Sequence, residues 1–492
     1  MRYLNAEDVL PAELLAQVQQ YADGIYLYIP RRADHRQNWG SSTRYREELH
    51  QRNESIRFLH DEGLGTEALA ERFHLSVKTI GSLMSSVRMK AITATMKANF
   101  LAVPTDCPQR DERLGWTGDT QVFCDSAMYN ADCNRFYRNY MEALRADCCE
   151  DGAVPSFVPM FYGVNQETCG SPCWGDSVAI IPYMHYHFYG DKRILVENLP
   201  QAKKWIDFYK AHLNQEGLVE GLFTYGDWLS VKEETDKSVM MQCFYGYSLL
   251  LVVKMCEIMG EDASKYRELH NVAKAAFRQH LMDEKGCVKS DTQTAYLVAY
   301  VAEFMSGEEI RQPLLQAIHC QDDTLTTGFI GVRFLLPVLS DIGETELAYK
   351  LMKNTQYPSW GYSVVNGATT IWERWNGYTA EKGFFNPSMN SFNHYSLGSC
   401  VYWLYAYVLG IRPQAGEKIK IAPDFSGQLT YAKGSYAFKK GQVFVSWRYI
   451  GTEIVLEVEK VGDFELEFSF GDRQILSQEA TDGKFVIRLS AT

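Results

Sequence analysis

The sequence predicts a mainly α-helical chain: a barrel of paired helices, followed by a small β-sandwich and preceded by a helix-turn-helix-like module. Three observations lead to this fold class. Helical apolar patterns fill residues 88–412 and alternate with long loops that carry Gly, Trp and Asp. From residue 413 the apolar period changes to two, as in strands. Residues 1–87 differ from both regions. We therefore expect three domains, over 1–87, 88–412 and 413–492.

The expected elements follow from these periods. Helical patterns cover 86–99, 119–146, 177–190, 192–213, 238–259, 263–282, 292–305, 311–316, 332–342, 344–355 and 390–409, and the range 119–146 reads as one long amphipathic helix. Strand patterns cover 418–421, 441–447, 453–458 and 484–489, with turns at Ser426-Gly427 and Asp482-Gly483. In a barrel of paired helices, the loops at one end build the site.

Composition excludes several classes of function. The 492 residues carry a net charge of −12, which disfavours affinity of the whole protein for nucleic acid or anionic membrane. No run of 18 or more apolar residues occurs, so no transmembrane helix is expected. The N-terminus lacks the apolar segment of a secretory signal, and we expect a cytoplasmic protein. The twelve scattered cysteines fit a reduced compartment, where they act as small hydrophobes.

The sequence predicts no metal and no organic cofactor. The pair Cys148-Cys149 and the spacing Cys169-x-x-x-Cys173 suggest metal ligands at first sight. No second Cys or His pair at finger-like spacing joins them. The chain also has no phosphate-binding glycine loop, haem motif or nicotinamide fingerprint.

Residues 63–87 have the spacing of a helix-turn-helix, with Thr66 as a helix cap, a turn at Leu75-Ser76 and a second helix from Val77. The first 85 or so residues resemble a family of small bacterial helix-turn-helix proteins akin to the phage Mor activator, which implies DNA binding. Against this, residues 1–87 hold 10 Lys and Arg and 12 Asp and Glu, and the second helix carries only Lys78 as a base. A helical hairpin used for packing is the alternative, so DNA stays an open partner.

Two segments carry the chemistry. Residues 103–119 place four carboxylates and two arginines beside Trp116. About 250 residues further on, Glu373 stands between Trp372 and Trp375. Two carboxylates with aromatic walls suit cleavage of a glycosidic bond. The alternatives are a salt-bridged capping loop for the first segment and a structural cap for Glu373.

The chain from about residue 95 to 492 resembles glycoside hydrolase family 78, the bacterial α-L-rhamnosidases. The resemblance rests on the motifs NFLAVPTDCPQRDERLGWTGD (99–119), YGDWLS (225–230), GFIGVRFLLPVLSDIG (328–343), YPSWGYSVVNGATTIWERWNG (357–377) and FNPSMNSFNHYSLGSC (385–400). It implies an (α/α)6 barrel and inverting hydrolysis of terminal non-reducing α-L-rhamnose from glycosides or oligosaccharides. Members of the family usually carry β-domains before the barrel, where this chain has its helix-turn-helix-like segment.

The resemblance also implies roles for single residues. Glu112 takes the position of the general acid and Glu373 that of the general base. The positions implied to contact the sugar are Asp106, Arg110, Trp116, Asp119, Trp174, Asp227, Trp228, Trp375 and His394. If residues 112–119 are helical, Glu112 and Asp119 share one face, and we expect Arg374 to support the charge of Glu373.

Two other functions remain open on the sequence. The first is an α/α-barrel glycosidase that acts on another deoxy or uronic sugar. The second is a rhamnoside-sensing DNA-binding regulator whose barrel does not catalyse. The pair Glu112 and Glu373 and the weak positive charge of residues 77–87 both speak against the regulator.

Overall fold

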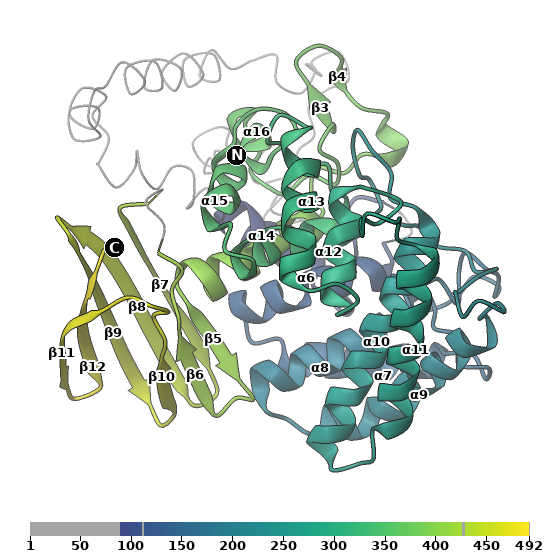
Figure 1. The fold of residues 1–492 in the computed structure, drawn as a ribbon, viewed down its shortest axis with the longest axis horizontal. Helices are drawn as coiled ribbons and strands as arrows, with labels where there is room; N and C mark the ends of the chain where they lie inside the picture. Colours follow the sequence, from purple (N-terminus) through teal and green to yellow (C-terminus); the bar gives the residue numbers. More distant parts are fainter. Residues whose placement is uncertain (1–88, 111–112, 426–428, 492) are drawn as a thin grey trace, which may run out of the picture. The chain divides into compact units, whose positions relative to one another are not determined.

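A computed structural model describes residues 89–110, 113–425 and 429–491. The predicted helix-turn-helix module and Glu112 lie outside the described residues. Within them, a helical region that includes four short strands comes first and the strands from residue 411 onward follow, in the order that the sequence predicts (Figure 1).

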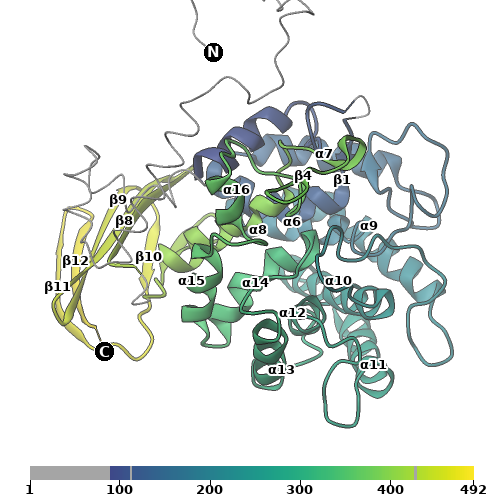
Figure 2. The ribbon, with the colours of Figure 1, turned by 90° about the horizontal axis from the view of Figure 1, so that it is seen from above.

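A closed ring of inner helices forms the centre of the helical region. Its members are α6 (Thr117–Asn130), α8 (Ser177–Tyr189), α10 (Lys237–Met259), α12 (Gln293–Val301), α14 (Phe329–Asp341) and the run η3 (Ser396–Cys400), α17 (Val401–Trp403) and η4 (Leu404–Val408). Each packs on the next, and η3 packs on both α14 and α6, which closes the ring (Figure 2). These helices are apolar on most sides because protein surrounds them.

A second set of helices covers this ring. It consists of residues 89–99, α7 (Asn134–Asp147), α9 (Arg193–Ala211), α11 (Ser264–His280), α13 (Gly307–His319) and α15 (Thr345–Lys353). In α7 the buried positions are Tyr137, Tyr140, Met141 and Leu144, the single stripe of a helix with one face in water. The described residues thus form six helical hairpins, which confirms the predicted barrel.

The single helix expected over 119–146 is two helices, α6 inside and α7 outside. The chain leaves helical geometry at Ala131, and the side chain of Asp132 accepts a hydrogen bond from the Asn134 backbone N–H at the start of α7. Such a side-chain acceptor replaces the missing partner of a first-turn N–H. The sequence predicts one helix here because the break at residues 131–133 contains neither Gly nor Pro.

The helix expected over 390–409 begins only at Ser396. Before that point the backbone pairs with a distant segment: Glu373 N–H donates to Ser391 O (2.9 Å) and His394 N–H donates to Ile371 O (2.9 Å). These long-range bonds hold residues 391–394 in an irregular loop.

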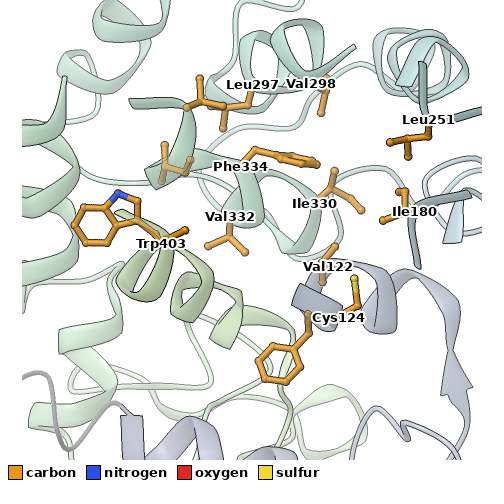
Figure 3. Packing of buried hydrophobic residues seen from close by; sticks show 14 of the residues in the cluster. Val122, Cys124, Ile180, Leu251, Leu297, Val298, Ile330, Val332, Phe334 and Trp403 are labelled. Atoms are coloured by element: carbon orange, nitrogen blue, oxygen red, sulfur yellow. The ribbon is translucent and has the colours of Figure 1, made fainter. Parts of the chain in front are cut away.

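Aliphatic and aromatic side chains from the inner helices fill the barrel (Figure 3). Among the described residues, α10 is the one helix long and apolar enough to cross a membrane by length and composition, with a mean hydropathy of 1.5. Because 83% of the most apolar 18-residue stretch of α10 is buried inside the protein, the helix is explained as a core helix.

The C-terminal strands form two sheets. The first has the order β10-β6-β5 and the second the order β11-β12-β9-β8-β7. Their bounds are β5 Ile411–Gln414, β6 Lys418–Ile421, β7 Tyr431–Phe438, β8 Gly441–Ile450, β9 Glu453–Gly462, β10 Glu465–Phe468, β11 Ile475–Thr481 and β12 Lys484–Ser490. Phe468 of one sheet contacts Phe485 of the other, with ring centroids 5.3 Å apart.

The sheets are joined tightly to the barrel. Tyr129 OH donates to Ile411 O (2.6 Å), and Trp447 Nε1 donates to Val408 O (2.7 Å). The predicted turn at Asp482-Gly483 links β11 to β12, with φ angles of 48° and 78° at its two residues. Positive φ at both central positions is the geometry that Asp-Gly favours in a two-residue hairpin loop.

Removing the carboxylate of Asp176 should destabilise the barrel strongly. This buried side chain accepts hydrogen bonds from Cys173 N–H (2.8 Å), Ser248 Oγ (2.6 Å), Trp205 Nε1 (3.0 Å) and Tyr209 OH (3.0 Å). Each orphaned buried donor costs about 1–3 kcal/mol. We therefore expect Asp176→Ala to lower the free energy of unfolding by more than about 4 kcal/mol.

Denaturant unfolding measures this loss against a matched control. Ser306 caps α13 in a reciprocal box with Glu309 at the protein surface, and Ser306→Ala should cost only about 1 kcal/mol. Equal losses in the two variants would contradict the importance assigned to the Asp176 hydrogen bonds.

Candidate active site

A cavity of about 590 Å³ lies where the inner helices begin. Eight of the predicted site residues line it: Asp106, Arg110, Trp116, Asp119, Trp174, Trp228, Glu373 and His394. The remaining lining residues are Gln109, Tyr225, Phe329, Pro387, Ser388, Met389 and Asn390. The volume suits a small organic ligand, and the positive ends of the helices favour carboxylates at this end of the barrel.

The segment that carries Asp106 and Trp116 is a loop that ends in a short strand. Asp106 N–H donates to Leu114 O (3.0 Å), and β1 (Gly115–Trp116) pairs with β2 (Phe157–Val158) before α6 starts. The condition under which Glu112 and Asp119 would share a helix face is therefore not met, because residues 113–116 are not helical. A Cβ at Gly115 would lie 2.6 Å from Val158 O, so glycine permits the close strand pairing here.

Arg110 joins the two carboxylate segments. Its Nη2 donates to Glu373 Oε2 (2.6 Å), and its Nη1 donates to Asp106 Oδ2 (3.3 Å). Glu373 is buried and also accepts Ser391 N–H at Oε2 (2.7 Å). A buried carboxylate needs such partners, because leaving it unpaired costs several kcal/mol.

Arg374, which the sequence predicts to support the charge of Glu373, forms no salt bridge with that carboxylate, although the two charges attract each other. Its Nε donates to Asn376 Oδ1 (3.0 Å), and its guanidinium lies 4.0 Å from the ring centroid of Phe385. The salt-bridge partner of Glu373 is Arg110, 263 positions away in the chain.

A second group of polar side chains surrounds Asp119. Its Oδ1 accepts from Ser396 Oγ (2.8 Å) and lies 3.3 Å from His394 Nε2. Burial raises the pKa of Asp119 to about 6; the His394 imidazole lowers it and the Asp106 carboxylate raises it further. Asp106 Oδ1 and His394 Nδ1 are buried without a hydrogen-bond partner, so they are available to ligand hydroxyls.

Aromatic rings form the opposite wall around Tyr225. Its ring centroid lies 4.7 Å from that of Trp174, 5.7 Å from Trp116 and 5.8 Å from Trp228. A Cβ at Gly118 would come within 2.3 Å of the Trp174 ring, so the indole lies directly on the first turn of α6. Trp174 Nε1 is buried without a partner. The wall offers apolar faces and one free N–H donor.

Two predicted contact residues do not line the cavity. Asp227 is buried and accepts N–H groups of Gly328 (2.8 Å), Ile330 (2.9 Å) and Gly331 (3.0 Å), so it holds the start of α14. Trp375 Nε1 donates to Thr327 O (2.8 Å). Packing accounts for both positions in this structure, and their predicted sugar contacts stay predictions.

Trp372 does not line the cavity either. Trp372 packs edge-to-face on Phe392, with centroids 5.1 Å apart, and Trp375 packs on Trp360 at 5.4 Å.

Sequence reasoning missed Tyr225, Phe329, Gln109 and residues 387–390. Tyr225 and Phe329 stand inside motifs already singled out, YGDWLS and GFIGVRFLLPVLSDIG, so closer attention to those aromatics would have found them. Residues 387–390 also stand inside a motif already singled out, FNPSMNSFNHYSLGSC, but they carry no aromatic or charged side chain that would mark them as ligand contacts. They line the cavity only because their loop folds beside Arg110, whose Nη2 lies 3.8 Å from Met389 Sδ.

The described residues contain no group of three or more His, Cys, Asp or Glu side chains that could hold a metal ion. The Sγ atoms of Cys149 and Cys169 lie 3.0 Å apart. The contact therefore joins one cysteine from each of the two short spacings, Cys148-Cys149 and Cys169-x-x-x-Cys173, that suggested metal ligands.

A second cavity, of about 620 Å³, lies at the other end of the inner helices and includes Pro337 and Asp341 from the last turns of α14. Arg333 and Asp125 line it and form an ion pair of 3.2 Å. None of the predicted site residues lines this cavity.

The first cavity thus combines a buried carboxylate held by an arginine, unpartnered hydrogen-bonding atoms and a wall of aromatic faces. Aromatic faces suit the C–H surfaces of a sugar, and polar atoms suit its hydroxyls. This arrangement on a six-hairpin barrel defines the class: a six-hairpin glycosidase-type domain.

Comparison with known proteins gives the family. Residues 78–408 match the model described as the bacterial alpha-L-rhamnosidase 6 hairpin glycosidase domain. The alpha-L-rhamnosidase of Streptomyces avermitilis is 37% identical over 381 residues, which are 76% of this chain and 36% of that protein. An alpha-L-rhamnosidase of Alteromonas sp. is 38% identical over 371 residues, 72% of this chain and 40% of that protein.

The solved structures agree. The crystal structure of the Streptomyces avermitilis alpha-L-rhamnosidase complexed with L-rhamnose matches with a TM-score of 0.76 and 34% identity, over 83% of this chain and 40% of that chain. The protein therefore belongs to the bacterial α-L-rhamnosidase family. The chain spans well under half the length of the relatives it matches.

A stretch of 86 residues, 18% of the chain, is 33% identical to the uncharacterized protein YraL of Bacillus subtilis and covers 99% of it. This match gives no function. The Mor-like resemblance and DNA binding gain no support from it.

Replacing Arg110 should destabilise the protein through Glu373. Arg110→Met leaves Glu373 buried without its counter-charge, and we expect a loss of about 3–5 kcal/mol in the free energy of unfolding. The double variant Arg110→Met/Glu373→Gln should recover most of this loss, because a neutral amide needs no cation. Arg374→Met is the matched control and should cost about 1 kcal/mol or less. An equal loss for both arginines would refute the assigned ion pair.

Asp119 should make stability depend on pH. Its pKa is about 6 in the folded protein and about 3.9 when unfolded, so folding favours its protonated form. Its contribution is present below about pH 4 and is lost as the pH rises through about 6. Relative to Asp119→Asn, the wild type should therefore lose about 1.4 kcal/mol per unit of pKa shift across this window. Unfolding curves at pH 4, 5, 6 and 7 measure the difference, and a constant difference would exclude the raised pKa.

Proposed function

We propose that this protein is an α-L-rhamnosidase that hydrolyses terminal non-reducing α-L-rhamnosides with inversion at the anomeric carbon. The convergence of eight predicted site residues on one cavity carries the proposal. Relatives named alpha-L-rhamnosidase, and a related structure complexed with L-rhamnose, support it.

Glu373 is the proposed general base. Arg110 and Ser391 N–H both bind its Oε2, which leaves Oε1 to take a proton from the attacking water. Glu112, outside the described residues, is the proposed general acid on the strength of the family motif. In an inverting pair the acid protonates the leaving oxygen while the base activates water on the opposite face of the ring, with carboxyl groups about 6.5–9.5 Å apart.

The sugar would be held between two walls. Asp106 Oδ1, His394 Nδ1 and Trp174 Nε1 are buried and unpartnered, and each can bond a hydroxyl. The rings of Trp116, Trp174 and Trp228 would cover its apolar face.

Hydrolysis of p-nitrophenyl α-L-rhamnoside tests this function. The wild type should release nitrophenol, and both Glu112→Gln and Glu373→Gln should lower kcat by roughly 100-fold or more, since each removes a proton-transfer group. Folding of the variants is checked by circular dichroism. Proton NMR should show the β-anomer of rhamnose first, which separates inversion from retention. Turnover of another glycoside but not of the rhamnoside would favour a different sugar specificity.

Gly118→Ala should weaken sugar binding by moving Trp174. The new methyl group would come within 2.3 Å of the indole, so the ring must shift. We expect the inhibition constant of L-rhamnose to rise roughly ten-fold, since small displacements of positioning groups have large effects. Gly163→Ala is the control, because a Cβ there meets no atom within 4 Å. An unchanged inhibition constant would show that Trp174 does not contact the sugar.

A cytoplasmic location and DNA binding through residues 1–87 remain proposals from the sequence alone. A salt-dependent shift of a DNA probe by the full chain, absent when Lys78 is replaced, would support the second.

A further inference from the structure

Two cysteine thiols face each other at the ends of a segment that supports the cavity wall. Cys149 follows the end of α7, and Cys169 lies 20 positions further along the chain, with the two Sγ atoms 3.0 Å apart. Both are thiols rather than halves of a disulfide in this structure. A disulfide bond is about 2.05 Å long, so the sulfur atoms need to approach by only about 1 Å to be joined.

The backbone holds both cysteines in this arrangement. Cys149 N–H donates to Ala153 O (2.9 Å) within a tight turn. Cys169 forms an isolated antiparallel bridge with Pro155, and Cys169 N–H donates to Asn165 O (2.9 Å). Because ordered backbone on both sides brings the sulfur atoms into contact, joining them requires small side-chain movements and no refolding.

The neighbouring Cys148 is directed elsewhere, since its Sγ donates to Leu144 O (3.2 Å), one turn back in α7. Of the facing pair, Cys149 is partly exposed and Cys169 is buried. Burial raises the pKa of the Cys169 thiol above its usual value, and the contact with Cys149 raises it further. The thiolate is the species that attacks, so a reagent in solution should react first at Cys149.

The segment between the two cysteines positions two rings of the cavity. It contains β2, which pairs with β1, the strand that carries Trp116. Ser156 O accepts Thr117 N–H (2.9 Å) at the start of α6, and Glu167 O accepts Tyr225 OH (2.8 Å). Trp116 and Tyr225 both line the cavity. A covalent bond between the ends of this segment would therefore hold the part of the chain that supports the aromatic wall.

We propose that Cys149 and Cys169 form an oxidation site, at which a low-molecular-weight disulfide converts the two thiols into a disulfide that closes the segment of residues 150–168. The Cys149 thiolate attacks one sulfur of the reagent, which gives a mixed disulfide and releases one thiol. The Cys169 thiolate then attacks Cys149 Sγ and expels the second thiol. Each protein thiol loses one hydrogen, and the reagent takes up the two electrons and two protons. This inference goes beyond the proposed rhamnosidase function and does not depend on it.

Peptide mass analysis of the folded full chain tests the bond. The reduced protein is incubated with oxidised glutathione, remaining thiols are blocked with N-ethylmaleimide, and the digest is analysed with and without dithiothreitol. Peptides joined through Cys149 and Cys169 should appear in the wild type and separate on reduction. A glutathione adduct on the exposed Cys320 shows that the reagent has reacted. If that adduct forms while Cys149 and Cys169 both carry maleimide, or if Cys149 stops at the mixed disulfide, the proposal is refuted.

Three variants distinguish this pair from its neighbour. Cys169→Ser should stop at the mixed disulfide on Cys149, because the second thiol is missing. Cys149→Ser should leave Cys169 unreacted towards glutathione, because the remaining thiol is buried. Cys148→Ser is the matched control and should form the bond within about two-fold of the wild-type rate. A bond from Cys148 to Cys169, a bond between two chains, or a bond that forms only in urea would contradict the assigned pair.

Hydrogen exchange measures what the bond does to the segment. A crosslink across 20 positions restricts the open states of the chain between its ends. Backbone amides of residues 150–168 should therefore exchange about ten-fold more slowly after oxidation, while those of α13 should be unchanged. Equal exchange before and after oxidation would overturn the closing of the segment. Both readouts are independent of turnover, so they remain decisive if the chain hydrolyses no rhamnoside.

Discussion

Burying the start of a helix imposes the constraint on which this structure depends. The first N–H groups of a helix have no partner within it, and inside a closed ring they cannot reach bulk water. Asp227 meets this need for α14 by accepting three backbone N–H groups. Glu373 accepts Ser391 N–H in the irregular loop before η3, where the backbone donor also lacks a partner within a helix. Carboxylates therefore gather at this end of the barrel for structural reasons, and the cavity lies among them.

The same constraint explains how distant segments become one site. Arg110 and Glu373 stand 263 positions apart, yet their ion pair joins the loop before α6 to the segment of residues 371–373. Backbone pairing of residues 371–373 with 391–394 adds a third segment. Fixed donors and acceptors in a partly closed cavity are the usual basis of electrostatic preorganisation in enzymes.

The sequence predicted the barrel well because helix periodicity is a strong local signal, and the family motifs located eight cavity residues. It failed where long-range contacts decide. The strand at Gly115 exists because Val158 lies beside it, and no local pattern shows that Arg110 forms the salt bridge with Glu373. Asp227 precedes Trp228, which lines the cavity, in the motif YGDWLS. Its carboxylate nevertheless binds backbone N–H groups at the start of α14. No local pattern separates a ligand contact from a buried support for the residue next to it.

The inner helix α10 shows what a barrel interior does to composition. A helix surrounded by protein and one surrounded by lipid are equally shielded from water, so hydropathy alone cannot tell them apart. The difference lies in its polar side chains. Gln242 accepts Val219 N–H (3.0 Å) and donates to Ala273 O (3.0 Å), while Ser248 binds Asp176. The polar side chains of α10 find hydrogen-bond partners on neighbouring loops and helices, as expected for a helix surrounded by protein.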